Sequence, residues 1–178
     1  MAPTPDSNPL RSYFSGLTEF TFETRLGVAD PSLVDYISEL LTRFTHFDGI
    51  YCIKNDSGRS VDQVADMLAM ADAAVLAARR EIHRHIGDFT LFWAGMYPEA
   101  LNHLQAAPRK DAYLNYPELG KRAYKIASTI VPQENPEENR VLMRLSHDYD
   151  LCLEGLKVVR REWESQGDIL GGGAFEAD

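Results

Sequence analysis

Two long stretches of the chain place apolar residues alternately three and four positions apart, the spacing that lines one face of an α-helix. The first stretch begins at Ser60 and continues to Phe92, and the second begins at Asn135 and ends near Gly167. β-Strands would instead need apolar residues at every second position. The spacing therefore predicts an all-α fold built around two long helices.

Capping patterns set the expected ends of these helices. Ser60 and Gln63 form a capping-box pattern, so we expect a continuous helix from Ser60 to Gly87, roughly 40 Å long at about 1.5 Å per residue. A kink or a new helix start is expected at Gly87–Asp88, because glycine disfavours a helix interior and aspartate is a good N-cap. Shorter helices are predicted from Asp30 to Gly49, from Asp88 to Gln105 with an interruption near Pro98, and from Tyr116 to Ile130.

Residues 12–26 fit a helix better than a strand, although alternating apolar residues leave a two-stranded ribbon of residues 20–26 and 50–53 as the alternative. The predicted architecture is an antiparallel helical bundle of about five to six helices, with its two longest helices packed against each other. It forms a single domain over residues 11–166. We expect residues 1–10 to be a disordered tail and residues 167–178 to be a flexible, acidic, glycine-rich tail.

Composition narrows the class of protein. The 178 residues are 44% hydrophobic and 25% charged, with no apolar run near the roughly 20 residues of a membrane-spanning helix. A net charge of −9 makes a nucleic-acid partner unlikely, because such binding depends on neutralising phosphates. The chain carries two cysteines and begins with no secretory pattern, so a cytoplasmic location is expected.

The stretch EIHRHIGD, residues 81–88, contains the densest group of potential metal ligands. At helical spacing Glu81, His85 and Asp88 share one face, and His147 and Asp148 of the second long helix could complete a divalent-metal site. The spacing departs from the Glu-x-x-His spacing of di-iron bundles and lacks the His-Glu-x-x-His spacing of zinc proteases. We therefore favour a structural interpretation, in which His85 is buried and hydrogen-bonded to Glu81 or Asp88.

Two arginine pairs, Arg79–Arg80 and Arg160–Arg161, could bind an anion or a nucleotide if the two long helices are neighbours. Solvated ion pairs with nearby glutamates explain the same residues without a ligand, and this interpretation is favoured.

The segment that follows EIHRHIGD is apolar on every side of a helix. Its members, which we predict to form an oligomer interface, are Phe89, Phe92, Trp93, Met96 and Tyr97. Burial within one chain is the alternative.

No glycine-rich phosphate loop, nucleophile elbow or Cys-x-x-Cys pair occurs in the sequence. The sequence therefore predicts a non-enzymatic protein that binds itself or another protein, without a cofactor. The alternatives are a metal-dependent enzyme that uses the carboxylate and histidine cluster with a divalent metal, and an anion or nucleotide binder that uses the arginines.

Overall fold

The computed structural model describes residues 9–130 and 134–171, and helices are the only regular elements in these residues. One isolated bridge pairs Lys54 with Ser60. This confirms the predicted all-α class. The longer helices are α1 (Pro9–Phe20), α2 (Pro31–Phe44), α4 (Val64–Ala73), α5 (Leu76–Met96), α7 (Tyr116–Thr129), α8 (Pro136–His147) and α9 (Tyr149–Gly171). Short helical turns are η1 (Thr21–Arg25, a π-helix), α3 (Phe47–Ile50), η2 (Pro98–Ala100), α6 (Leu101–Leu104) and η3 (Lys110–Tyr113).

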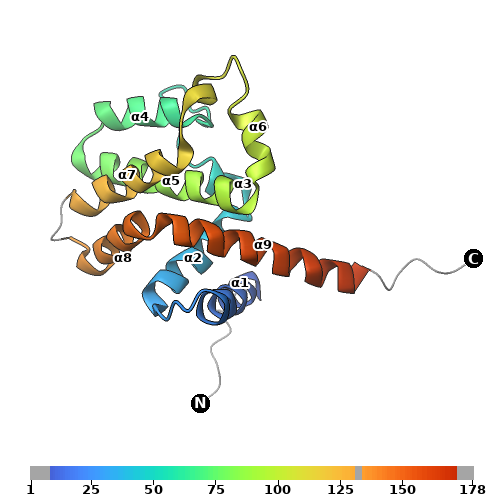
Figure 1. Cartoon of the computed structure of the whole chain (residues 1–178). Coiled ribbons are helices and arrows are strands. Elements are labelled where there is room, and N and C mark those ends of the chain that lie inside the picture. Colours follow the sequence, from blue (N-terminus) through green and yellow to red (C-terminus); the bar gives the residue numbers. More distant parts are fainter. Residues whose placement is uncertain (1–8, 131–133, 172–178) are drawn as a thin grey trace, which may run out of the picture.

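Helix α5 lies in the middle of the fold, between α4 on one side and α9 with α1 and α2 on the other (Figure 1). Tyr149 at the start of α9 donates a hydrogen bond to Thr90, and Arg160, near the middle of α9, donates to the carbonyl of Met96 at the end of α5. The two longest helices therefore run in the same direction where they pack against each other, so this pair is not antiparallel as neighbouring helices of the predicted bundle would be. Helices α7 and α8 lie between α5 and α9 in the chain, and this long connection allows α9 to run in the same direction as α5.

The buried apolar side chains form two cores that meet along α5. The first core joins α1, α2, α8 and α9 to the C-terminal half of α5, and includes the fully buried Ile37, Leu145 and Leu156. The second core joins α4 and α7 to the N-terminal half of α5, around Met67 and Ile86. Helix α5 thus supplies side chains to both cores, which explains why most of its residues are buried.

The predicted continuous helix from Ser60 to Gly87 is wrong, because the chain reverses between α4 and α5. Residues Ala74 and Val75 adopt extended backbone angles there. Arg79 then donates hydrogen bonds of 3.0 Å to the carbonyls of Ala71 and Asp72, which lie at the end of α4. Both helices of this hairpin face the same core, so the apolar spacing continues across the turn and conceals it.

The predicted capping box at Ser60 and Gln63 does not form either. The start of α4 is instead capped from a distant part of the chain, since the Asp111 carboxylate accepts hydrogen bonds from the backbone amides of Val64 (2.8 Å) and Ala65 (2.9 Å). A carboxylate at a helix N-terminus satisfies free amides and interacts favourably with the helix dipole.

The second long helix is also divided. Helix α8 ends at His147 and α9 begins at Tyr149, with Asp148 outside helical geometry between them. The Asp148 carboxylate forms an ion pair with Arg144, one turn earlier. The bend lets α8 pack on α7 while α9 packs on α5. The end expected at Gly167 is wrong, since α9 continues to Gly171.

No kink or new helix start occurs at Gly87–Asp88, where α5 continues without interruption. The glycine serves close helix packing instead. A Cβ atom at Gly87 would lie 2.5 Å from the ring of Tyr124 in α7, and one at Gly120 would lie 2.5 Å from the hydroxyl of Tyr149. These two glycines allow α5 and α7 to approach each other closely.

Several other expectations are confirmed. Helix α2 starts at Pro31, where the Asp30 side chain accepts a hydrogen bond from the amide of Leu33, and α7 starts at Tyr116 with Asn115 as cap. Residues 12–25 are helical, so the alternative ribbon does not form in the described residues. The helix predicted from Asp88 to Gln105 is broken just before Pro98 into the end of α5 and the short η2 and α6.

The predicted tails lie mostly outside the described residues, although α1 already begins at Pro9. Within the described residues, none of the helices combines the length and the apolar character needed to span a membrane.

Candidate functional site

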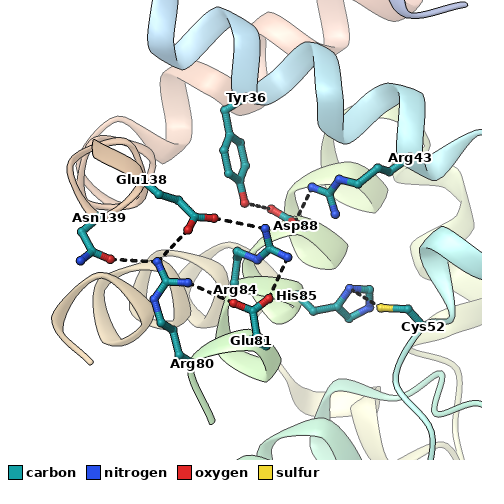
Figure 2. A network of polar contacts seen from close by, with 10 residues as sticks. All are labelled: Tyr36, Arg43, Cys52, Arg80, Glu81, Arg84, His85, Asp88, Glu138 and Asn139. Carbon is teal, nitrogen blue, oxygen red and sulfur yellow. Dashed lines mark hydrogen bonds and ion pairs between the residues drawn. The ribbon is translucent and has the colours of Figure 1, made fainter. Parts of the chain in front are cut away.

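The polar face of α5 carries a fully buried carboxylate, Asp88. It accepts a hydrogen bond of 2.8 Å from the hydroxyl of Tyr36 and forms an ion pair of 2.9 Å with Arg43 (Figure 2). The hydroxyl of Tyr124 donates a third hydrogen bond, of 2.7 Å, to the same carboxylate. A buried charge is tolerated only when it is paired and hydrogen-bonded, and these three donors meet that requirement. The cluster ties α5 to α2 and α7.

The same cluster shifts the ionisation of both tyrosines. Burial, and then the negative charge of Asp88, raises the pKa of Tyr36 and of Tyr124 well above 10.0. Both tyrosines therefore remain neutral hydrogen-bond donors over the physiological pH range.

One helical turn earlier, two arginines and two glutamates form a second group. Arg80, which is buried, contacts Glu81 and Glu138 at 3.0 Å each and donates a hydrogen bond of 2.9 Å to the side chain of Asn139. Arg84 contacts Glu81 at 2.8 Å and Glu138 at 3.2 Å. Each carboxylate thus bridges both guanidinium groups, and Glu138 joins α5 to α8 (Figure 2). We call this group the arginine–glutamate network.

His85 lies between these two groups and contacts neither with its ring nitrogens. Its Nδ1 lies 3.3 Å from the Sγ of Cys52, in the loop after α3, and its ring packs against Phe44 and Phe89. Its Nε2 is buried and makes no hydrogen bond of normal geometry. Burial lowers the pKa of His85, and the Asp88 charge and the Ile50 backbone oppose this shift without reversing it. The ring is therefore neutral near pH 7.

The five residues of the metal hypothesis are not gathered into one ligand set. Glu81 and Asp88 are each paired with arginine, and His85 faces a thiol. His147 is exposed and lies beside Asp148 at the junction of α8 and α9. Among the residues that the structure describes, no three histidine, cysteine, aspartate or glutamate side chains are placed to hold a metal ion.

The two arginine pairs are also separated. Arg79 caps α4 and Arg80 belongs to the arginine–glutamate network, whereas Arg160 contacts Glu99 at 2.6 Å, close to the end of α5. Arg80 lies more than four helical turns before that end, roughly 24 Å away at about 1.5 Å per residue. Arg161 lies beside Arg160, so the four arginines do not form one anion site.

The aromatic segment of α5 divides between the core and the surface. Phe89, Phe92 and Met96 are buried within the chain, whereas Trp93 and Tyr97 are only partly buried. The last two line an apolar hollow of about 450 Å³, which we call the aromatic groove. Its other lining residues are Leu10, Tyr13 and Phe14 of α1, Phe44, Thr45 and Ile50 near the end of α2 and α3, Phe92, and Trp163 of α9.

Sequence reasoning did not identify the partners of Asp88 and His85. Tyr36 and Arg43 lie seven residues apart beside the apolar stripe of α2, a spacing that places both on one side of the helix and could have suggested a shared partner. Nothing in the sequence indicates that Cys52 meets His85, because the contact depends on how the loop after α3 folds back.

No protein-family model, curated protein or solved structure matches this chain. Fold and site together define an all-helical protein with a buried polar face on its central helix and an apolar groove at its surface.

Proposed function

We propose that this protein is a self-associating helical module and that two copies meet through the aromatic groove. The observation that carries the proposal is the lining of the groove, which contains no charged side chain. Four other surface hollows, of about 320 to 470 Å³, are each lined by three or more charged side chains. Contiguous exposed apolar surface of this kind marks interaction sites.

The groove has the features of a surface that can pair with itself. A two-fold interface brings the same patch of both copies together, so the patch must contain both a hollow and groups that project into one. Leu10, Tyr13 and Trp163 supply the projecting groups, since they border the hollow and are 42%, 37% and 37% exposed. Large aromatic residues are also those that contribute most to binding energy at interfaces.

The net charge of the protein predicts how self-association depends on salt concentration. Each copy carries a net charge of −9, so two copies repel each other at long range. Salt screens this repulsion but does not weaken apolar contacts. Self-association should therefore strengthen as the salt concentration rises.

The test is light scattering coupled to size exclusion, over protein concentrations from micromolar to millimolar. The expected mass rises from 20.0 kDa for one chain toward twice that value. A central tryptophan at an interface contributes about 2 kcal/mol or more, so Trp163→Glu should weaken association at least about 30-fold.

The matched control is Tyr113→Glu, which introduces the same charge at an aromatic residue that is 96% exposed and does not line the groove. It should leave association nearly unchanged. Circular dichroism of both variants verifies that each remains folded. A mass of one chain at every concentration, or equal effects of the two substitutions, would overturn the proposal.

A further inference from the structure

Cys52 and His85 form a contact of 3.3 Å beside the Asp88 cluster and the arginine–glutamate network. Cys52 is exposed, whereas the His85 side chain is almost fully enclosed, at 4% exposure, and directs its Nδ1 at the thiol (Figure 2). The carboxylates of Glu81 and Asp88, on the same helix, are occupied by arginines and tyrosines. The imidazole therefore has the thiol as its side-chain hydrogen-bond partner.

The geometry of the ring favours a chemical role over a purely structural one. Its Nε2 lacks a hydrogen bond of normal geometry, and leaving a buried polar group unsatisfied costs about 1–3 kcal/mol. The rings of Phe44 and Phe89 pack against the imidazole, at centroid distances of 5.8 and 6.0 Å. The fold thus keeps a buried, neutral base against an accessible thiol, the arrangement that activates a cysteine nucleophile.

We propose that Cys52 is a site of covalent modification by low-molecular-weight disulfides, with His85 as the base that accepts the thiol proton. As Sγ of Cys52 attacks one sulfur of the disulfide, its proton passes to Nδ1 of His85. A new S–S bond forms, the original S–S bond breaks, and the departing thiolate takes the proton from His85. One protein thiol and one disulfide thereby give one mixed disulfide and one small thiol, with no change in the total number of electrons.

Burial and three neighbouring charged side chains set the pKa values of both members of the pair. The charged side chains are Arg43 of α2 and Arg84 and Asp88 of α5, and each interacts electrostatically with both Cys52 and His85. Burial raises the pKa of the Cys52 thiol and lowers that of His85, so both are neutral between these two pKa values. Over that pH range, proton transfer must accompany sulfur attack.

The test measures the reaction of the native full-length protein with 4,4′-dithiodipyridine, followed by release of 4-thiopyridone, with mass spectrometry to locate the modified residue. In the wild type the Cys52 rate should be nearly independent of pH between the two pKa values. It should fall at lower pH, where His85 is protonated. A thiol without a base would instead react about tenfold faster for each added pH unit, because only the thiolate attacks. Such a slope throughout would overturn the proposal.

The variant His85→Gln retains a polar side chain but cannot accept the proton. Near pH 7 it should react at Cys52 at least about tenfold more slowly than the wild type, and the difference should vanish at high pH, where the thiolate forms without help. An equal rate at neutral pH, or a ratio that does not change with pH, would also contradict the proposal.

The second cysteine provides a control within the same molecule. Cys152 is fully buried, and burial raises the pKa of its thiol to about 12, so it should react far more slowly than Cys52 in the folded protein. Rapid modification of Cys152 in His85→Gln would reveal unfolding, and the wild-type pH profile then remains the deciding measurement.

Discussion

Replacing Asp88 with asparagine removes the charge at the centre of the fold while keeping the shape of the side chain. Tyr36 and Tyr124 both donate to Oδ1, so the asparagine carbonyl can preserve these two hydrogen bonds. Arg43 donates to Oδ2, where the amide of asparagine is itself a donor and cannot accept. Arg43 is 39% exposed at its side chain and can turn to solvent, which reduces the loss.

The expected cost follows from these contacts. Hydrogen bonds to charged groups contribute about 1.5–3 kcal/mol, and breaking a buried ion pair costs about 3–5 kcal/mol. Because Arg43 can reach solvent, we expect Asp88→Asn to lower the free energy of unfolding by about 2–4 kcal/mol. For a chain of this size that corresponds to a fall in Tm of roughly 5–15 °C.

Urea denaturation followed by circular dichroism measures this loss. The control is Asp56→Asn, which makes the same change of charge at an exposed position and should stay within about 0.5 kcal/mol of the wild type. Equal stability of the two variants would refute the claim that the Asp88 cluster holds α2, α5 and α7 together.

Two further stability predictions follow from the same region of the fold. Gly120→Ala would force a Cβ atom against Thr90 and Tyr149, so it should destabilise the protein by about 2 kcal/mol or more. The control is Gly16→Ala. Gly16 has open space around it, so this substitution should be neutral or stabilising by up to about 1 kcal/mol. Thermal denaturation of both variants checks this, and similar shifts would contradict the packing described for α5 and α7. The raised pKa values of Tyr36 and Tyr124 predict a loss of stability above about pH 10, because these tyrosines ionise in the unfolded chain at a pH at which they stay neutral in the folded one. In the Tyr36→Phe variant, the free energy of unfolding should fall less steeply as the pH rises above about 10. An unchanged slope of this free energy against pH would count against the burial of the Tyr36 hydroxyl.

Helix class and several helix starts could be predicted from the sequence because they depend on local signals. Asp30 before Pro31 marks the start of α2, and Asn115 marks that of α7, since both caps act on amides only three residues away. The two long helices could not be divided correctly, because both sides of each turn contribute to the same apolar stripe. The cap of α4 is Asp111, which lies 46 or 47 residues from the amides it binds.

The candidate site shows the same limit. The sequence identified Glu81, His85 and Asp88 as a polar group on one helical face, and the structure places all three on α5. Their partners come from elsewhere in the chain, however, so the choice between a metal site and a paired structural cluster depended on residues such as Arg43 and Cys52. Helical periodicity describes which face a residue occupies, and it carries no information about what packs against that face.

Photocrosslinking can show whether two copies meet at the aromatic groove. A benzophenone side chain at Tyr13, which lines the groove, should join two chains and mark groove residues such as Trp93 or Tyr97. Mixing chains labelled with light and heavy nitrogen separates links between copies from links within one copy. Mixed-isotope links in the groove are expected from position 13, and few are expected from the same group at Tyr113. Links only within single chains, or equal yields from both positions, would contradict it.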